Sequence, residues 1–80
     1  MNVPSLADVR PTLTPRQAEF VAVVLSGETS VDWCKRAYIS PKTAEAHAHL
    51  FARRVGLPRM CGHGIREAVL RMRIKELEQR

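Results

Sequence analysis

Two dipeptides, Thr14-Pro15 and Ser40-Pro41, constrain what this chain can fold into more than any other feature. In each, a side-chain oxygen that can cap free backbone N–H groups precedes a proline, which suits the first helical position because the N–H that it lacks would be unpaired there. Gln17 completes a capping box with the first dipeptide. A glycine, which readily adopts the left-handed conformation that ends a helix, follows each start, at Gly27 and Gly56.

The intervals between these signals predict an all-α fold. From Gln17 to Ser26 nearly every position is apolar, so the first helix, predicted over about 15–26, is expected to be buried on most sides. A short helix of about two turns follows Thr29 or Ser30, either of which can cap it. A third helix is predicted over 41–55, and a helical pattern resumes after a glycine-rich loop, over about 64–79.

Chain length and composition limit the organisation to one domain. Eighty residues with 45% hydrophobic content allow a single core and exclude a cleft between domains. Residues 1–12 contain prolines and few periodic apolar positions, so we expect a flexible, irregular N-terminal arm before one domain at 13–80. No apolar run approaches the roughly 20 residues that span a bilayer. Two cysteines and no signal-like segment favour a cytoplasmic location.

Positive charge is concentrated in the middle of the chain. The net charge is +5, and residues 31–60 hold six Lys and Arg against two Asp and Glu. A solvated basic face and a phosphate-facing surface are both consistent with this excess. The helix over 41–55 favours the second, because one of its stripes is small or polar: Lys42, Glu45, Ala46, His49 and Arg53. A short helix, a tight turn and a longer helix with such a stripe is the arrangement of a helix-turn-helix, whose second helix enters the major groove.

Two motifs carry a resemblance to a known family. The first comprises Leu13-Thr14-Pro15-Arg16, Glu19 and Gly27, and the second comprises Ile39-Ser40-Pro41-Lys42-Thr43, Glu45, His47 and Gly56. From Leu13 to about Leu57 the chain resembles the LuxR-type (GerE-like) helix-turn-helix family, without a gap between the motifs. The resemblance implies a four-helix DNA-binding domain in which the third helix reads bases and the fourth takes part in dimerisation.

The resemblance also assigns roles to individual positions. It implies base contacts by Glu45, Ala46 and His49, and phosphate contacts by Lys42, Thr43 and Arg53, with Arg16 and Arg54 as further candidates. The chemistry is consistent, since a carboxylate accepts a hydrogen bond from cytosine N4, alanine meets a thymine methyl, and cations and hydroxyls bond phosphates. The alternative for Glu45 is that it bonds Lys42 or Arg53 and orients them.

The C-terminal helix is longer than usual and carries more apolar surface than one core-facing stripe needs. We expect a homodimer interface formed by Val69, Leu70, Ile74 and Leu77. Pairing would bury this stripe and double the DNA contacts, whereas the alternative is that the stripe borders the monomer's own core.

The sequence therefore predicts a transcription regulator that binds double-stranded DNA as a homodimer on an inverted-repeat operator. Because only about 12 residues precede the domain, we expect a stand-alone repressor that senses no small molecule itself. The alternative is an interaction protein that pairs with a larger LuxR-type regulator through its last helix and inhibits or redirects it.

Metal, cofactor, catalytic and RNA-binding roles are not expected. The residues of metal-binding type are Cys34, Cys61, His47, His49 and His63. Only Cys61 and His63 bring a cysteine and a histidine close together in sequence, and no Cys-x-x-Cys pair exists. A catalytic Cys/His pair needs an oriented base and a pocket, for which so small a domain has little room. Trp33, Tyr38 and the two phenylalanines are expected to pack or form interfaces, which disfavours RNA binding.

Overall fold

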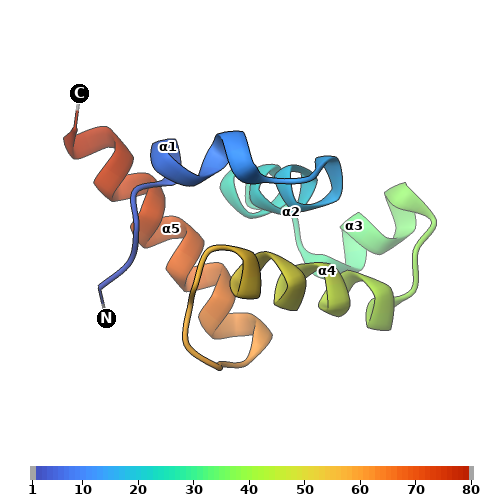
Figure 1. Ribbon diagram of the computed structural model, residues 1–80. Helices are drawn as coiled ribbons and strands as arrows, with labels where there is room; N and C mark the ends of the chain where they lie inside the picture. The colour runs from blue at the N-terminus through green and yellow to red at the C-terminus, as the bar shows by residue number, and fades with distance from the viewer. Residues whose placement is uncertain (1, 80) are drawn as a thin grey trace.

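The computed structural model describes residues 2–79, which contain helices and no strand. Their order is α1 (Leu6–Val9), the 3₁₀ helix η1 (Arg10–Thr12), α2 (Pro15–Ser26), α3 (Ser30–Ala37), α4 (Pro41–Arg54) and α5 (Gly62–Glu78). In Figure 1, α1 lies beside the C-terminal half of α5, and α3 stands at the opposite end of the molecule. The all-α prediction is confirmed, with one more short α-helix than the four expected.

The first capping box forms as the sequence predicts. Thr14 Oγ1 accepts a hydrogen bond from the Gln17 backbone N–H at 3.2 Å, and Gln17 Oε1 accepts one from the Thr14 N–H at 3.0 Å. At the other end, Gly27 adopts a φ of 79°, and its N–H bonds the carbonyls that the last turn leaves free. These contacts set α2 at 15–26, the predicted bounds.

The next two helices also begin at side-chain caps. Thr29 Oγ1 accepts a hydrogen bond from the Asp32 backbone N–H, and Ser40 Oγ accepts one from the Thr43 N–H at 3.1 Å. Just past α4, Gly56 adopts a left-handed conformation with a φ of 77°, so the helix cannot continue. The short helix and the helix predicted over 41–55 are therefore confirmed, the latter ending one residue early, at Arg54.

Aromatic rings from three helices form the centre of the core. The Phe20 ring of α2 lies 6.1 Å from the Trp33 ring of α3 and 5.5 Å from the Phe51 ring of α4, between ring centroids. Tilted aromatic pairs at such distances add attraction beyond the area they bury. Ile65 and Met72 bring the apolar face of α5 into the same core. The cluster thus fixes α3 and α4 relative to each other, as a helix-turn-helix requires.

The prediction of a flexible, irregular arm over 1–12 is wrong for the residues that the structure describes; Met1 lies outside them. Residues 6–12 are helical, and the side chains of Val3 and Leu6 are buried in the core beside α5. Lys75 Nζ also donates a hydrogen bond to the Val3 carbonyl at 2.9 Å. Val3, Leu6 and Val9 recur at a spacing of three, but three positions in a segment that also holds Pro4 and Pro11 are too few to identify a buried helix from the pattern.

Two further elements differ from expectation. Helix α5 begins at Gly62 rather than at 64, because the Ile65 N–H already donates to the Cys61 carbonyl at 3.0 Å. Tyr38 was expected to pack, but its side chain is 95% exposed. It ends α3 with a φ of 56°, a left-handed conformation that is unfavourable for a residue with a side chain.

Candidate nucleic-acid interface

Helix α4 buries one face and exposes the other. Its buried residues are Ala44, Ala48, Phe51 and Ala52. The residues predicted to contact bases, Glu45, Ala46 and His49, are all exposed. With about 100° of rotation per residue, they share an arc of roughly 100° with Lys42 and Arg53. The five predicted residues therefore do form one outward face, which we call the α4 face.

Glu45 and His49 interact on this face. His49 Nε2 lies 3.5 Å from Glu45 Oε1, one helical turn apart, and both side chains are well exposed. Glu45 makes no ion pair with Lys42 or Arg53 among the described residues. Glu45 therefore does not orient either cation through an ion pair within residues 2–79. Its carboxylate lies beside the exposed imidazole of His49 instead.

The basic side chains divide by whether they have an acceptor within the described chain. Seven are hydrogen-bonded or ion-paired: Arg10, Arg16, Arg36, Arg54, Arg66, Arg73 and Lys75. Those with no acceptor among residues 2–79 are Lys35, Lys42, Arg53, Arg59 and Arg71. Four of these five belong to α3, α4 or the loop after α4. Among the described residues, the basic side chains without an acceptor are therefore concentrated in α3, α4 and the loop after α4.

This division separates the five predicted phosphate contacts. Lys42 and Arg53 are exposed and have no acceptor, and Thr43 is exposed near Lys42 with its Oγ1 accepting from Ser40 Oγ at 3.0 Å. Arg16 is paired with Glu19 at 2.8 Å. Arg54 Nε instead donates to the Thr12 carbonyl at 3.0 Å, which ties α4 to the N-terminal segment. Of the five, Lys42 and Arg53 thus have no acceptor among residues 2–79, whereas Thr43, Arg16 and Arg54 make side-chain contacts within the protein.

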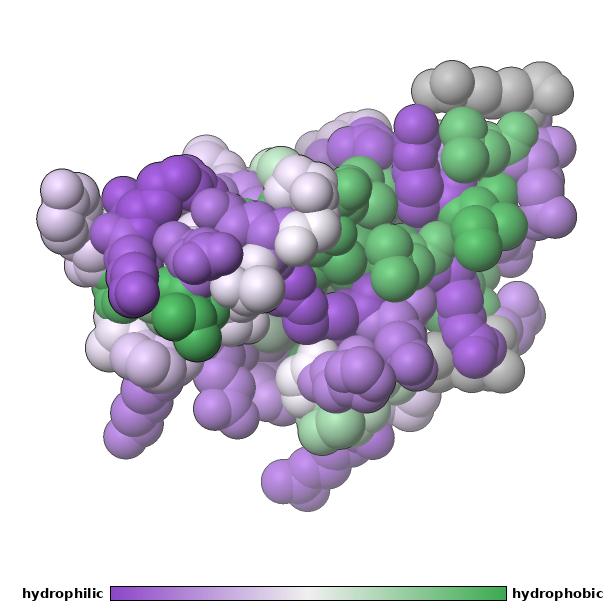
Figure 2. All heavy atoms as spheres, turned by 180° about the vertical axis from the view of Figure 1, so that it is seen from behind, coloured by the Kyte–Doolittle hydropathy of each residue, from purple (hydrophilic) through white to green (hydrophobic). Residues whose placement is uncertain are grey.

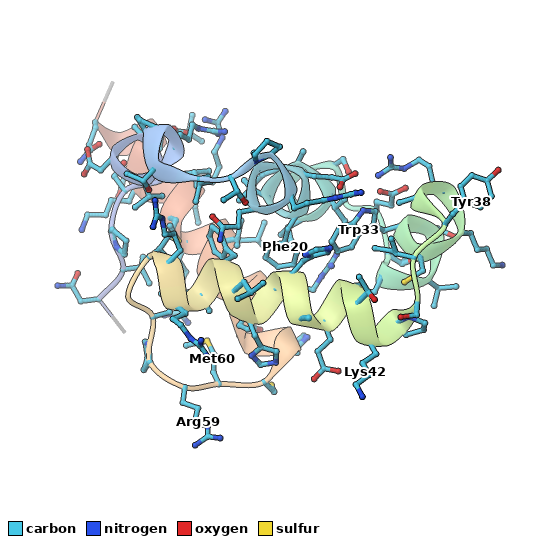
Figure 3. All side chains as sticks on the ribbon, turned by 45° about the vertical axis from the view of Figure 1, so that its right-hand side comes forward. Phe20, Trp33, Tyr38, Lys42, Arg59 and Met60 are labelled. Atoms are coloured by element: carbon cyan, nitrogen blue, oxygen red, sulfur yellow. The ribbon has the colours of Figure 1, made fainter. Side chains whose placement is uncertain are left out.

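Arg59 is a residue that the sequence assignment missed. It lies in the loop between α4 and α5, is exposed, and has no acceptor within 2–79. In Figure 3, Arg59 and Lys42 both project from the lower edge of the molecule, away from the core marked by Phe20 and Trp33. Its place in the central basic segment was visible in the sequence, but its direction depends on how the loop folds.

The predicted dimer residues fall into two groups. Val69 is fully buried in the monomer core, so its assignment to a dimer interface is wrong. Leu70, Ile74 and Leu77 are 47%, 57% and 46% exposed. They lie on α5 at helical spacing and form what we call the α5 stripe. Figure 2 shows hydrophobic surface over the part of the molecule where α5 ends.

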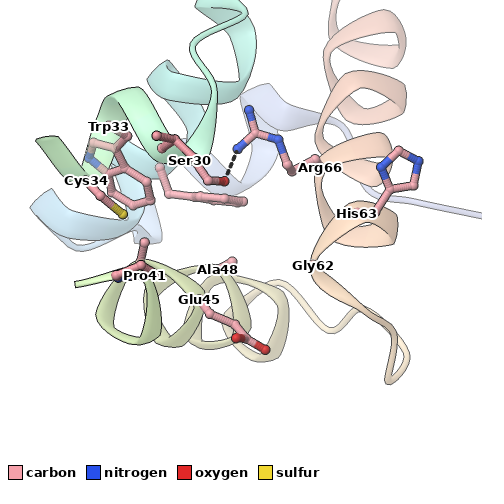
Figure 4. A pocket seen from close by; sticks show the side chains of 12 residues that line it. Ser30, Trp33, Cys34, Pro41, Glu45, Ala48, Gly62, His63 and Arg66 are labelled. Atoms are coloured by element: carbon pink, nitrogen blue, oxygen red, sulfur yellow. Dashed lines mark hydrogen bonds between the residues drawn. The ribbon is translucent and has the colours of Figure 1, made fainter. Parts of the chain in front are cut away.

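A hollow of about 430 Å³ adjoins the α4 face (Figure 4). It lies between α3, α4 and the start of α5, and Trp33 and Ala48 are among the residues that line it. Arg66 crosses its edge and donates to Ser30 Oγ at 3.4 Å and to the Glu28 carbonyl. These bonds hold the loop before α3 against α5.

The described residues contain neither a metal-binding cluster nor a helix that could span a membrane. Between residues 2 and 79 no three His, Cys, Asp or Glu side chains gather into a group that could hold a metal ion. None of the helices in that range is both long and apolar enough to cross a membrane. Comparison of the chain with protein-family models, curated proteins and solved structures finds no match in any of the three.

Proposed function

We propose that this protein is a sequence-specific transcription regulator that binds double-stranded DNA with α4 in the major groove. The observation that carries the proposal is the α4 face: Lys42 and Arg53, two cations without an acceptor among residues 2–79, flank a surface of small and polar side chains. Cations bond phosphates and set the position of a helix on the duplex. A small residue at the centre, Ala46, lets the backbone approach the bases.

The dimensions of the face suit this role. Lys42 and Arg53 are eleven residues apart on α4, which corresponds to about 16 Å along the helix. The major groove is about 12 Å wide, so cations at the two ends of α4 can reach the phosphates that border it. Between them, Glu45 can accept from a cytosine amine and His49 can donate to a base. A carboxylate repels phosphate, so Glu45 contributes selectivity rather than general affinity.

The surrounding packing supports a rigid reading helix. The Trp33 ring of α3 lies 6.1 Å from the His47 ring of α4 and the same distance from Phe20, between ring centroids. Helix α3 therefore braces α4 in the manner of the first helix of a helix-turn-helix. The resemblance of residues 13–57 to the LuxR-type family points to the same role.

We further propose that the active form is a homodimer on an inverted repeat, paired through the α5 stripe. Isologous pairing of two stripes would remove Leu70, Ile74 and Leu77 from water. We favour repression, because a dimer seated on an operator blocks other proteins from that DNA without any further contact surface.

Selection from a random pool of duplexes, with the mass of the protein and of the complex measured in solution, tests this proposal. We expect enrichment of an inverted repeat with half-sites separated by about 10 base pairs or a multiple, and two chains per duplex. A flat selection profile would overturn sequence-specific binding. One chain per duplex would overturn the dimer.

The second candidate is an interaction protein that pairs with a larger regulator. The exposure of the α5 stripe favours it, because an apolar surface of this kind can bind another protein in the absence of DNA. Two variants separate the candidates in a reporter assay. Lys42→Glu combined with Arg53→Glu abolishes regulation if DNA binding is the function. Unchanged regulation in that variant, together with loss of regulation in Leu70→Asp, would establish the interaction protein instead.

A further inference from the structure

The loop between α4 and α5 is held at two points. After α4, the Leu57 N–H donates to the Ala52 carbonyl at 2.9 Å and the Gly56 N–H donates to the Arg53 carbonyl at 3.3 Å. Leu57 is half-buried and packs against the core, as does Met60 three residues later. Because both ends of this short stretch are packed inward, the residues between them are directed outward.

The second point is fixed by contact with the start of α5. A Cβ at Gly64 would lie 3.3 Å from Met60 Sδ, so the methionine side chain occupies the space that the glycine leaves. Pro58 restricts the backbone between the two points, because its ring fixes φ. Arg59 is therefore presented from a restrained loop.

We propose that Arg59 contacts the phosphate backbone of the DNA and is a second positioning contact beyond the C-terminal end of α4; this rests on the proposed DNA-binding function. Lys42 and Arg59 project from the same edge of the molecule, one near the start of α4 and the other after its end (Figure 3). The fourteen residues of α4 span about 21 Å. Cations near the start of α4 and beyond its end can therefore bracket a groove about 12 Å wide and reach the backbones on its two borders.

The charge and surroundings of Arg59 fit phosphate better than an acidic side chain of the protein. Its neighbours Pro58 and Met60 carry no charge, and no carboxylate among residues 2–79 lies within ion-pairing distance of it. Guanidinium groups bond phosphate oxygens through two parallel N–H donors. Such a contact sets position and affinity without reading the base sequence.

The salt dependence of affinity tests the proposal, with the duplex enriched in the selection as the probe. The slope of log affinity against log salt is negative, and each phosphate contact that is lost reduces its magnitude by about 0.9. Since the proposed dimer carries each residue twice, we expect Arg59→Gln and Lys42→Gln each to reduce that magnitude by about twice this amount, and Arg59→Lys to keep it. Arg71→Gln is the matched control, since Arg71 is also exposed and has no acceptor in the described part of the chain, but lies on α5. It should keep the wild-type slope.

The outcomes separate this proposal from the proposed function. Arg59→Gln with a slope of smaller magnitude, an unchanged thermal midpoint and an unchanged preference among duplexes establishes a positioning contact. If Arg59→Gln keeps the wild-type slope while Lys42→Gln has a slope of smaller magnitude, the role of Arg59 alone is overturned. An equal loss in Arg71→Gln also overturns it, because any exposed cation would then act alike. A wild-type protein that selects no duplex overturns the proposed function itself.

Discussion

Arg10 donates two hydrogen bonds to the Glu76 carboxylate, at 3.0 and 3.3 Å, and joins residues that are 66 positions apart in the sequence. Arg73 donates to the same carboxylate from the preceding turn of α5. The hydrogen bonds of Arg10 and then of Arg73 lower the pKa of Glu76 from 4.5 to about 2. The N-terminal segment is thereby fastened to the C-terminal helix, and α5 becomes the element that closes the fold.

This ion pair predicts a loss of stability in acid. The folded-state pKa of Glu76 lies below its ordinary value, so its contribution is fully present above pH 4.5 and is lost as the pH falls toward about 2. We expect the thermal midpoint to fall through this window, and Glu76→Gln to start lower and fall less. Circular dichroism melts between pH 7 and pH 2 measure both. Glu28, whose pKa the Arg36 hydrogen bond also lowers, contributes in the same direction, so Glu76→Gln should flatten the profile only in part.

Leu6 tests whether the N-terminal segment belongs to the core. It is fully buried, so Leu6→Ala should lower the free energy of unfolding by about 2 to 5 kcal/mol in urea denaturation. Asp8, exposed on the same short helix, provides the matched control, and Asp8→Ala should change it by no more than about 0.5 kcal/mol. Equal, small effects of the two changes would mean that the segment does not hold the core.

Tyr38 predicts a variant that is more stable than the natural chain. Its φ of 56° is unfavourable for a residue with a Cβ, and its side chain, 95% exposed, gains little from packing. Tyr38→Gly should therefore raise the free energy of unfolding by about 1 kcal/mol. Tyr38→Ala keeps the strain and should leave it almost unchanged. A destabilised glycine variant would show that the tyrosine ring makes a stabilising contact.

Local signals were sufficient to predict the main helices, because each cap acts over three or four residues. Thr14 and Ser40 bond N–H groups three positions on, so the residue types and their spacing contain the whole interaction. Long-range partners have no such signature. Arg54 Nε bonds the Thr12 carbonyl 42 residues away, and no local pattern indicates that pairing.

Tertiary packing also explains why one of the four predicted interface residues on α5, Val69, is buried while the other three are exposed. Val69 and Leu70 are adjacent and equally apolar, and about 100° of helix rotation places one in the core and the other at the surface. Which of the two is covered depends on where α1, α2 and α4 dock on α5. The stripe was predictable as an excess of apolar residues, but its edge was set by tertiary packing.

The α5 stripe predicts an association that a single charge disrupts. Leu70→Asp should convert the proposed dimer to a monomer, because it places an unpaired charge in an apolar interface. Sedimentation or light scattering measures the mass, and a thermal melt checks that the half-exposed position leaves the fold intact. Arg71→Asp, on the next residue but outside the stripe, is the control. A wild-type protein that is monomeric at high concentration and on DNA would contradict the interface.

Glu45 predicts a change in which duplexes are chosen. If its carboxylate accepts from a cytosine amine, Glu45→Gln should relax the preference at one position of each half-site by about 1 to 3 kcal/mol. Removing a negative charge from a surface near phosphates should at the same time raise the affinity for unrelated duplexes. Repeating the selection with the variant measures the first effect, and titration of a scrambled duplex measures the second. Because Glu45 also pairs with His49, His49→Gln is the companion variant. If Glu45→Gln leaves every position unchanged while His49→Gln alters one, the carboxylate only orients the imidazole and the histidine reads the base.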